Sequence, residues 1–206
     1  MTTTTLTGLY DTYDAATRTV RALEALSVPS ADISLVAYPA DGTGESVPAT
    51  NDAGPGAEIG ASTGVVLGGG AGLLAGLGML AIPGVGPVVA AGWLVATAVG
   101  VMAGAGAGGA AGGLIGSMIS SGVTPEQAEF YAEGIRRGGS LVTARVETAL
   151  FDAAEAIMER HGRIDPVTRG KAYYDGGWRR FDATSSPMAP ADIARERARY
   201  PVFPLI

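Results

Sequence analysis

The order of apolar and polar residues predicts strands and helices on either side of a long apolar stretch. Residues 5–10 alternate and predict a strand, and residues 32–38 alternate in the same way. Between them, residues 13–26 place Ala, Val and Leu side chains on one helical face. The N-terminal part of the chain therefore predicts a β-α-β unit.

The C-terminal half shows a second set of such patterns. Residues 124–137 begin with Thr-Pro-Glu-Gln, which is the start pattern of a capped helix. Residues 140–146 predict a third strand, and residues 148–160 predict another helix that ends before a glycine. Residues 163–167 predict a short last strand, placed at a sheet edge because it contains Pro166.

Together the two halves predict an α+β fold, in the form of a ferredoxin-like, four-stranded antiparallel sheet with helices on one face. A long Gly/Ala-rich helical hairpin is expected as an insertion between the second and third strands. The expected parts are residues 1–39 and 123–167 as the two halves of this domain, 40–57 as a flexible connector, 58–122 as the hairpin, and 168–206 as an aromatic and basic tail.

The inserted stretch contains no charged residue between Glu58 and Glu126. Residues 82–87, Ile-Pro-Gly-Val-Gly-Pro, divide it into two limbs that we expect to be antiparallel helices. Small residues at every fourth position form a smooth helical stripe, which lets backbones approach closely, as in membrane helices. The glycines expected to form this packing surface are Gly60, Gly64, Gly68, Gly72, Gly76, Gly92, Gly100, Gly104, Gly108, Gly112 and Gly116.

Helix length and glycine content are compatible with two environments for the limbs, a membrane and the interior of a soluble oligomer. Residues 59–82 would form about 36 Å of helix, enough to cross a hydrocarbon core of about 30 Å, whereas residues 88–121 are too long for one span. Each Gly in an exposed helix costs roughly 1 kcal/mol relative to Ala, so the stripes must be packed. The hairpin is therefore expected in a membrane or inside a soluble homo-oligomer.

Composition excludes several classes of function. The chain of 206 residues suits one domain, or one domain with a large insertion. A net charge of −6 argues against nucleic-acid binding, and the absence of Cys excludes disulfides, thiolate metal sites and Cys nucleophiles. The N-terminus has no basic segment followed by an apolar run, so no secretory signal is expected.

The candidate reactive groups have structural interpretations. Residues 104–109 match the dinucleotide pattern G-x-G-x-x-G, but an apolar helix is expected before them and no acid follows until Glu126. His161, the one histidine, is expected at a helix end, and Asp11 or Asp14 is expected to cap the first helix. We therefore expect no catalytic residue, no metal, no cofactor and no enzymatic activity.

Aromatic residues and arginines come together in the tail. Residues 178–181, Trp-Arg-Arg-Phe, are expected to pack on the protein's own sheet or on a neighbouring subunit rather than on a membrane or a nucleic acid. Residues 190–200 carry a weak helix signal that ends at Pro201.

Several segments resemble one family, the bacterial general stress proteins of the heat-induced, YflT-like group. Leu-Tyr-Asp-Thr-Tyr-Asp-Ala-Ala at residues 9–16 is similar to the opening of these proteins, as are residues 20–23 and 32–36. Residues 122–128, 131–135, 137–142 and 160–162 are similar to their closing half, and the Gly-rich insertion looks like the form seen in many members. The resemblance implies a stress-linked bacterial protein, supplies no catalytic residue and leaves the tail outside.

The expected function is that of a non-enzymatic general stress protein that self-associates through its glycine-zipper hairpin. This interpretation places the hairpin in or at a membrane, with the sheet domain in the cytoplasm, so the expected partners are a second copy and the lipid bilayer, and no nucleic acid. One alternative is a cytoplasmic homo-oligomeric scaffold protein whose hairpins are buried in the assembly. The other is a ligand-sensing module or enzyme, which a pocket with convergent polar groups would favour.

Overall fold

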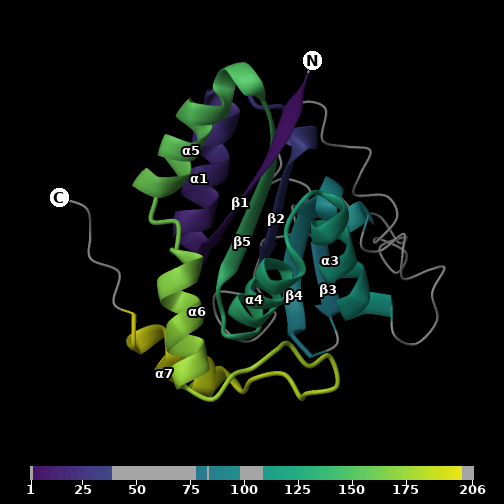
Figure 1. The fold of residues 1–206 in the computed structure, drawn as a ribbon, viewed down its shortest axis with the longest axis vertical. Coiled ribbons are helices and arrows are strands. Elements are labelled where there is room, and N and C mark those ends of the chain that lie inside the picture. The colour runs from purple at the N-terminus through teal and green to yellow at the C-terminus, as the bar shows by residue number, and fades with distance from the viewer. Residues whose placement is uncertain (1, 39–77, 83, 98–108, 201–206) are drawn as a thin grey trace, which may run out of the picture.

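The computed structural model describes residues 2–38, 78–82, 84–97 and 109–200. Its strands, helices and 3-10 turns (η) are β1 (Thr3–Tyr10), α1 (Tyr13–Ala25), η1 (Ser30–Asp32), β2 (Ile33–Ala37), β3 (Gly78–Ile82), β4 (Gly86–Gly92), α3 (Gly109–Ser120), α4 (Pro125–Arg136), β5 (Ser140–Glu147), η5 (Thr148–Leu150), α5 (Phe151–Arg160), α6 (Pro166–Asp175) and α7 (Pro190–Ala198). The α+β class is confirmed (Figure 1).

One antiparallel sheet joins the two halves of the chain, in the strand order β1-β5-β2-β4-β3. The strand β5 lies between β1 and β2 and runs antiparallel to both, so that Val142 stands opposite Gly8 on one side and Leu35 on the other. The strands β1 and β2 with α1 therefore form a split β-α-β unit around β5. The predicted common sheet for the two halves is confirmed, with the strands β4 and β3 added beyond β2.

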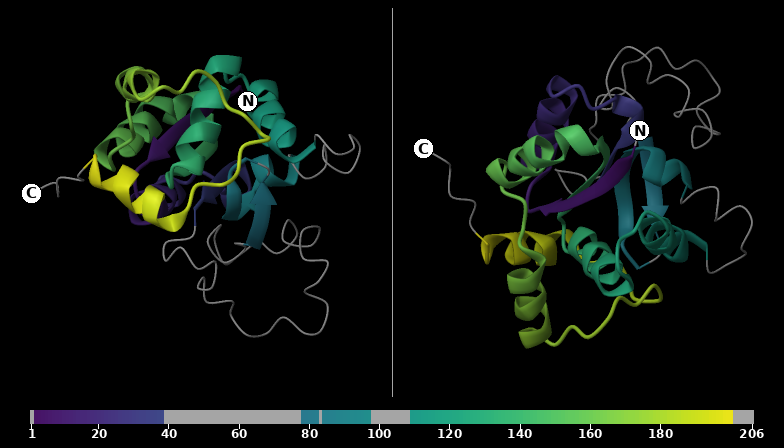
Figure 2. Two further views of the ribbon diagram at one scale, coloured as in Figure 1. Left: turned by 90° about the horizontal axis from the view of Figure 1, so that it is seen from below. Right: turned by 45° about the horizontal axis from the view of Figure 1, so that its top comes forward.

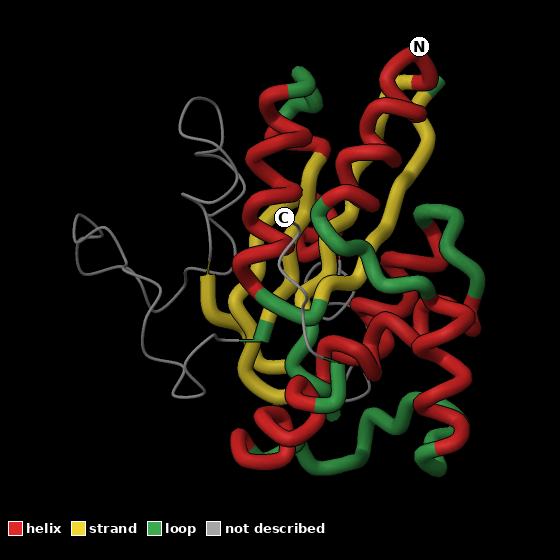
Figure 3. The backbone as a smooth tube through the Cα atoms, turned by 90° about the vertical axis from the view of Figure 1, so that its left-hand side faces the viewer, coloured by secondary structure: helices red, strands yellow, loops and turns green. Residues whose placement is uncertain are grey.

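Helices cover both faces of this sheet, whereas the sequence predicted them on one face (Figure 3). The helices α1 and α5 pack on one face around Leu23, Val142 and Met158. The helices α3, α4 and α6 cover the other face around Met118 and Ile135. All five residues of β2 are buried, as expected for a strand with helices on both sides.

The predicted fourth strand, residues 163–167, is wrong. The backbone N–H of Ile164 donates one hydrogen bond to the Leu9 carbonyl at 2.8 Å, and the chain then turns into α6. The Asp165 carboxylate caps that helix by accepting from Val167 N–H, and Pro166 occupies the first helical turn. The Asp-Pro pair thus starts a helix, and β1 remains at the edge of the sheet.

The predicted helical hairpin is also wrong over residues 78–92, which form two strands. Val85 N–H donates to the Ile82 carbonyl at 3.0 Å, so the predicted turn exists but joins β3 to β4. The β-branched Val88 and Val89 favour a strand, and pairing with β2 buries them on opposite faces. Residues 109–120 are helical as predicted, whereas 59–77 and 98–108 lie outside the described residues.

The expected helix ends are confirmed at two sites and corrected at one. Thr124 caps α4, with Pro125 in its first turn, and His161 follows the last residue of α5. The helix α1, however, is capped by the Thr12 hydroxyl, which accepts from Ala15 N–H at 3.2 Å. Asp11, predicted as a cap, instead pairs with Arg169 of α6 at 2.7 Å.

The tail packs on the protein's own core, as expected. After α6 the chain buries Phe181, passes the β3–β4 turn and returns to α7 (Figure 2). The helix α7 is fixed by Glu196, which is buried and pairs with Arg137, the residue that follows α4, at 2.8 Å. Arg137 also pairs with the buried Glu133 at 2.6 Å, so one guanidinium joins two buried carboxylates.

Two glycine substitutions distinguish a strand from a helix in the Gly-rich stretch. Gly92 has φ of 99° at the end of β4, and a Cβ there would lie 2.2 Å from the Ile33 carbonyl oxygen. We expect Gly92→Ala to lower the free energy of unfolding by more than about 2 kcal/mol, measured by urea denaturation. A non-glycine residue held in a strained backbone conformation alone costs about 1–3 kcal/mol, and the Cβ clash adds to this.

Gly116→Ala is the matched control, because this helical glycine of α3 has open space around its Cβ position. It should raise the free energy of unfolding by roughly 0.5–1 kcal/mol. A continuous helix through residues 88–121 would make both substitutions stabilising, so a stabilising Gly92→Ala would contradict the strand.

Candidate functional site

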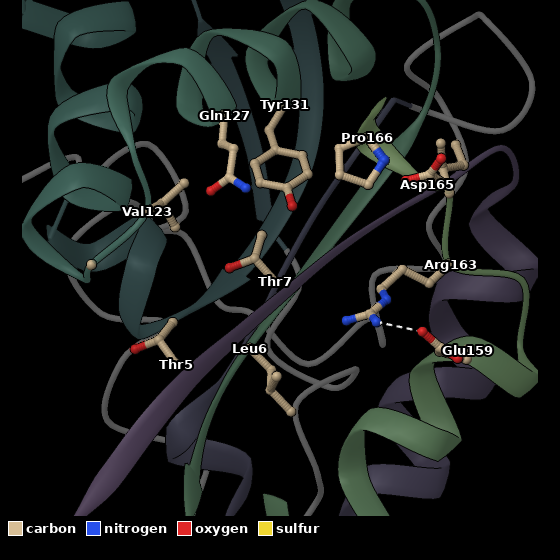
Figure 4. Close-up of a pocket in the computed structure, with 12 residues that line it drawn as sticks. Thr5, Leu6, Thr7, Val123, Gln127, Tyr131, Glu159, Arg163, Asp165 and Pro166 are labelled. Atoms are coloured by element: carbon tan, nitrogen blue, oxygen red, sulfur yellow. Dashed lines mark hydrogen bonds and ion pairs between the residues drawn. The ribbon is translucent and has the colours of Figure 1, made fainter. Parts of the chain in front are cut away.

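A polar groove of about 360 Å³ runs along the outer edge of β1 (Figure 4). We call it the edge groove. The strand β1 forms its floor, α4 and the turn before it form one wall, and the end of α5 with the start of α6 forms the other. Its main lining residues are Thr5, Thr7, Gln127, Tyr131, Glu159 and Arg163.

Backbone groups of β1 face this groove. Ile164 N–H reaches the Leu9 carbonyl from the groove side, whereas Thr148 N–H donates to the Thr2 carbonyl from the β5 side. The N–H and C=O groups of successive strand residues alternate between the two edges of a strand. Thr3, Thr5 and Thr7 therefore direct their backbone groups away from β5, toward an edge where the described part of the chain places no strand.

A row of hydroxyl side chains lies on adjacent strands, starting at this edge, on the face of the sheet that α4 covers. Thr7, Thr143 and Ser34 stand opposite one another on β1, β5 and β2. The Ser34 hydroxyl donates to the Ala91 carbonyl at 2.8 Å. The hydroxyl oxygens of Thr7 and Thr143 are buried and have no hydrogen-bond partner in the described structure. An unpaired polar group of this kind is costly, and at Thr7 it borders the groove.

The helix α4 contributes an amide and a phenol, because Gln127 and Tyr131 are one helical turn apart and project from the same side (Figure 4). Burial raises the pKa of Tyr131, and the nearby Arg163 guanidinium offsets this in part. The phenol therefore stays protonated at neutral pH and can donate a hydrogen bond into the groove.

The opposite wall carries a charge cluster with an excess of acid. Arg163 pairs with Glu159 at 2.7 Å and with Glu155 at 3.2 Å. Burial lowers the pKa of Arg163, but its hydrogen bonds to these two carboxylates outweigh the burial and raise it. Asp165 lies at the same end, and hydrogen bonds from Thr168 lower its pKa. The groove lining thus carries the carboxylates of Glu159 and Asp165 against the one guanidinium of Arg163, which also pairs with Glu155. This excess of acid favours donor-rich or cationic groups over anions.

A second groove of similar volume lies between α4 and α6, and its character is different. It is lined by Phe130, Tyr174 and Trp178, with Val167 exposed at its rim. Its aromatic walls offer apolar contact without a row of free backbone groups. The edge groove combines backbone, hydroxyl, amide and charged groups, and is therefore the candidate site.

Three glycines of the ladder predicted as the packing site lie within the described structure, in two different elements. Gly92 ends β4, whereas Gly112 and Gly116 belong to α3, and Gly116 faces open space. The remaining predicted glycines lie outside the described residues, namely Gly60, Gly64, Gly68, Gly72, Gly76, Gly100, Gly104 and Gly108.

Sequence reasoning missed the groove residues. The one available signal was the run of Thr at residues 2–5 and 7, which is uncharged and β-branched, but its importance depends on β1 lying at an edge. His161 stands at the end of α5, where burial, helped by Arg18 and Arg160, lowers its pKa, and it does not line the groove. Among the described residues, no cluster of acidic or His side chains suits a metal ion, and no helix is both long and apolar enough to cross a bilayer.

Comparisons with known proteins give no relative for this chain. No family model, no curated protein and no solved structure matches it.

The unpaired hydroxyl of Thr143 gives a stability test. We expect Thr143→Val to raise the free energy of unfolding by about 1 kcal/mol, because a methyl group replaces a buried hydroxyl without a partner. Ser34→Ala should lower it by a similar amount, since it removes the hydrogen bond to Ala91. Urea denaturation of both variants measures this, and destabilisation by Thr143→Val would mean that the hydroxyl has a partner.

Proposed function

We propose that the chain is a non-enzymatic association protein whose binding site is the edge groove. The groove takes an extended polypeptide segment, which adds to the sheet as a strand beside β1. The observation that carries this proposal is the row of outward backbone groups on Thr3, Thr5 and Thr7 beside a polar groove. Strand addition uses such groups for affinity and neighbouring pockets for specificity.

The walls of the groove fit alternate side chains of an added strand. Side chains of a strand point to its two faces in turn, so one set would meet Gln127 and Tyr131 and the other would meet Glu159 and Arg163. The acid excess at the α5 wall favours a Lys side chain over a Glu side chain there.

The arrangement of the hydroxyls supports binding over catalysis. Nucleophilic catalysis by a hydroxyl requires a neighbouring base within hydrogen-bond reach. The Thr7 hydroxyl has no such partner in the described structure. Tyr131 is held in its protonated form by burial, so it serves as a donor. These groups can orient a bound chain by hydrogen bonds without a proton transfer.

A pair of capped pentapeptides tests the groove. The peptide Ac-TVKVT-NH2 should bind and shift the backbone amide signals of Thr3, Thr5 and Thr7 in a saturable NMR titration. Ac-TVEVT-NH2, which differs by one charge, should bind at least several-fold more weakly because of the acid excess.

Thr5→Pro is the matched protein variant for this titration. It removes an outward N–H, which an edge strand tolerates, and should abolish the amide shifts while circular dichroism stays unchanged. Equal binding of both peptides to the parent chain and to Thr5→Pro would refute strand addition.

A second candidate function is self-association through the Gly-rich stretch, at a membrane, in a protein of the general stress type. Its support is the ladder of small residues without charge and the way the stretch is attached to the fold. The strands β3 and β4 extend the sheet, and α3 packs on α4 through Leu114 and Met118. The Gly-rich stretch therefore contacts the sheet domain both before residues 98–108, through β3 and β4, and after them, through α3.

Paired substitutions test this second function. Replacing Gly68 and Gly72 by Leu should disrupt assembly far more than replacing both by Ala, because Leu blocks close backbone approach. The assembly size of each variant is measured by sedimentation, both in detergent and on the fractions of lysed cells. An unchanged size in the Leu variant would show that these glycines do not form a packing surface.

A further inference from the structure

We propose that the strand bound in the edge groove is β1 of a second copy of this chain, paired antiparallel about a two-fold axis at Thr5. This inference rests on the proposed strand addition and names its partner. The two sheets would then form one continuous sheet across the axis.

The free backbone groups of β1 are symmetric about Thr5. Toward the C-terminal end, Ile164 already occupies the Leu9 carbonyl, so that among the described residues Thr7 is the last outward residue with neither backbone group bonded. At the other end the strand starts at Thr3. The outward set is thus Thr3, Thr5 and Thr7, with Thr5 in the middle. A two-fold axis there places Thr5 opposite the partner's Thr5, and Thr3 opposite the partner's Thr7.

This register also satisfies the hydrogen-bond pattern. In an antiparallel pair, two residues that both direct their backbone groups across the interface exchange two hydrogen bonds. Every pair in the proposed register joins two such residues, since Thr3, Thr5 and Thr7 all point outward. A shift by one residue would oppose outward groups to groups already used by β5. A shift by two residues would leave Thr3 or Thr7 without an outward residue opposite it, so the axis at Thr5 pairs the largest number of outward groups.

The chemistry of β1 favours its own copy as partner. The strand has neither charge nor proline, which are the devices that commonly keep edge strands apart. Thr side chains opposite one another form favourable cross-strand pairs, and β-branched residues favour the extended backbone. The first residues of β1, Thr3 and Thr4, are exposed on the described chain, whereas Leu6 and Leu9 are buried. The segment from Thr3 to Thr7 that a second copy would cover therefore includes the exposed end of the strand.

Single cysteines test the register, since the chain contains none of its own. In the proposed dimer the two Thr5 Cα atoms are about 5.5 Å apart, within disulfide range. Thr5→Cys should therefore form a covalent dimer on mild oxidation at micromolar protein. Thr3→Cys alone should not, because its two copies lie about 14 Å apart. A mixture of Thr3→Cys and Thr7→Cys should form the crossed dimer.

The uncrosslinked chain gives an independent measurement by sedimentation velocity. Thr5→Pro should be monomeric where the parent chain dimerises, because it lacks the N–H at the axis. Thr5→Val keeps that N–H and should dimerise within about twofold of the parent. Equal cross-linking of all three single-Cys variants, or equal dimerisation of the parent and Thr5→Pro, would overturn the proposal.

The cross-linking and the peptide titration distinguish a wrong partner from a wrong binding mode. If the parent chain is monomeric and Thr5→Cys gives no dimer, but the Lys pentapeptide still binds and is lost in Thr5→Pro, then strand addition stands and the second copy is the wrong partner. If neither the pentapeptide nor a second copy engages the Thr5 amide, both are wrong.

Discussion

The pairing of β5 with both β1 and β2 is the interaction on which the rest of the structure depends. The strands β1 and β2 come from the N-terminal part of the chain and β5 from the C-terminal half, and in the sheet of the described residues β5 alone connects β1 to β2. Both faces of β5 are buried from Ser140 to Ala144, so its formation requires a helical layer on each side. The helices α1 and α5 supply one layer, and α3, α4 and α6 supply the other. The position of α4, and with it Tyr131, follows from this requirement.

The three strands β1, β5 and β2 have two outer sides, and the described chain adds further strands on one side but not on the other. Beyond β2, the Gly-rich stretch supplies β4 and β3, so that Val36 pairs with Ala90. Beside β1, the chain starts a pairing at Ile164 and then leaves it, because Asp165 and Pro166 begin a helix. The same Asp-Pro step that ends the pairing also builds one end of the groove. The open edge and the groove beside it therefore have one cause.

The sequence predicted those elements whose patterns have a clear period or a cap. The strands β1, β2 and β5 alternate, and the helix starting at Pro125 has its Thr124 cap, so these were predicted close to their observed bounds. The strands β3 and β4 were missed because a stretch composed only of apolar residues and Gly has no period to separate strand from helix. Residues 163–167 were misassigned because Pro166 suits both an edge strand and a first helical turn.

The groove could not be predicted from local pattern, since it exists only where distant segments meet. Thr7, Tyr131 and Arg163 belong to three different elements, and none of them is unusual in its own segment. What makes Thr5 and Thr7 distinctive is that β1 lies at an edge of the sheet formed by the described residues, which is a property of the whole sheet. Gly92, predicted in a helical stripe from spacing alone, belongs instead to a strand end, whereas Gly116 lies in a helix as predicted but has open space at its Cβ position.

The tail completes the groove indirectly, through α6. Arg169 of α6 pairs with Asp11 at 2.7 Å and lies 3.5 Å from the ring centre of Tyr200. Tyr173 of the same helix is buried, with the Arg137 guanidinium 4.2 Å from its ring centre. Arg137 in turn holds Glu196 of α7, so α6 and α7 are fixed to α4 by one buried charge network. Because α6 begins at Pro166, this network also fixes the end of the groove where Asp165 and Arg163 meet β1, although the network itself lies away from the groove.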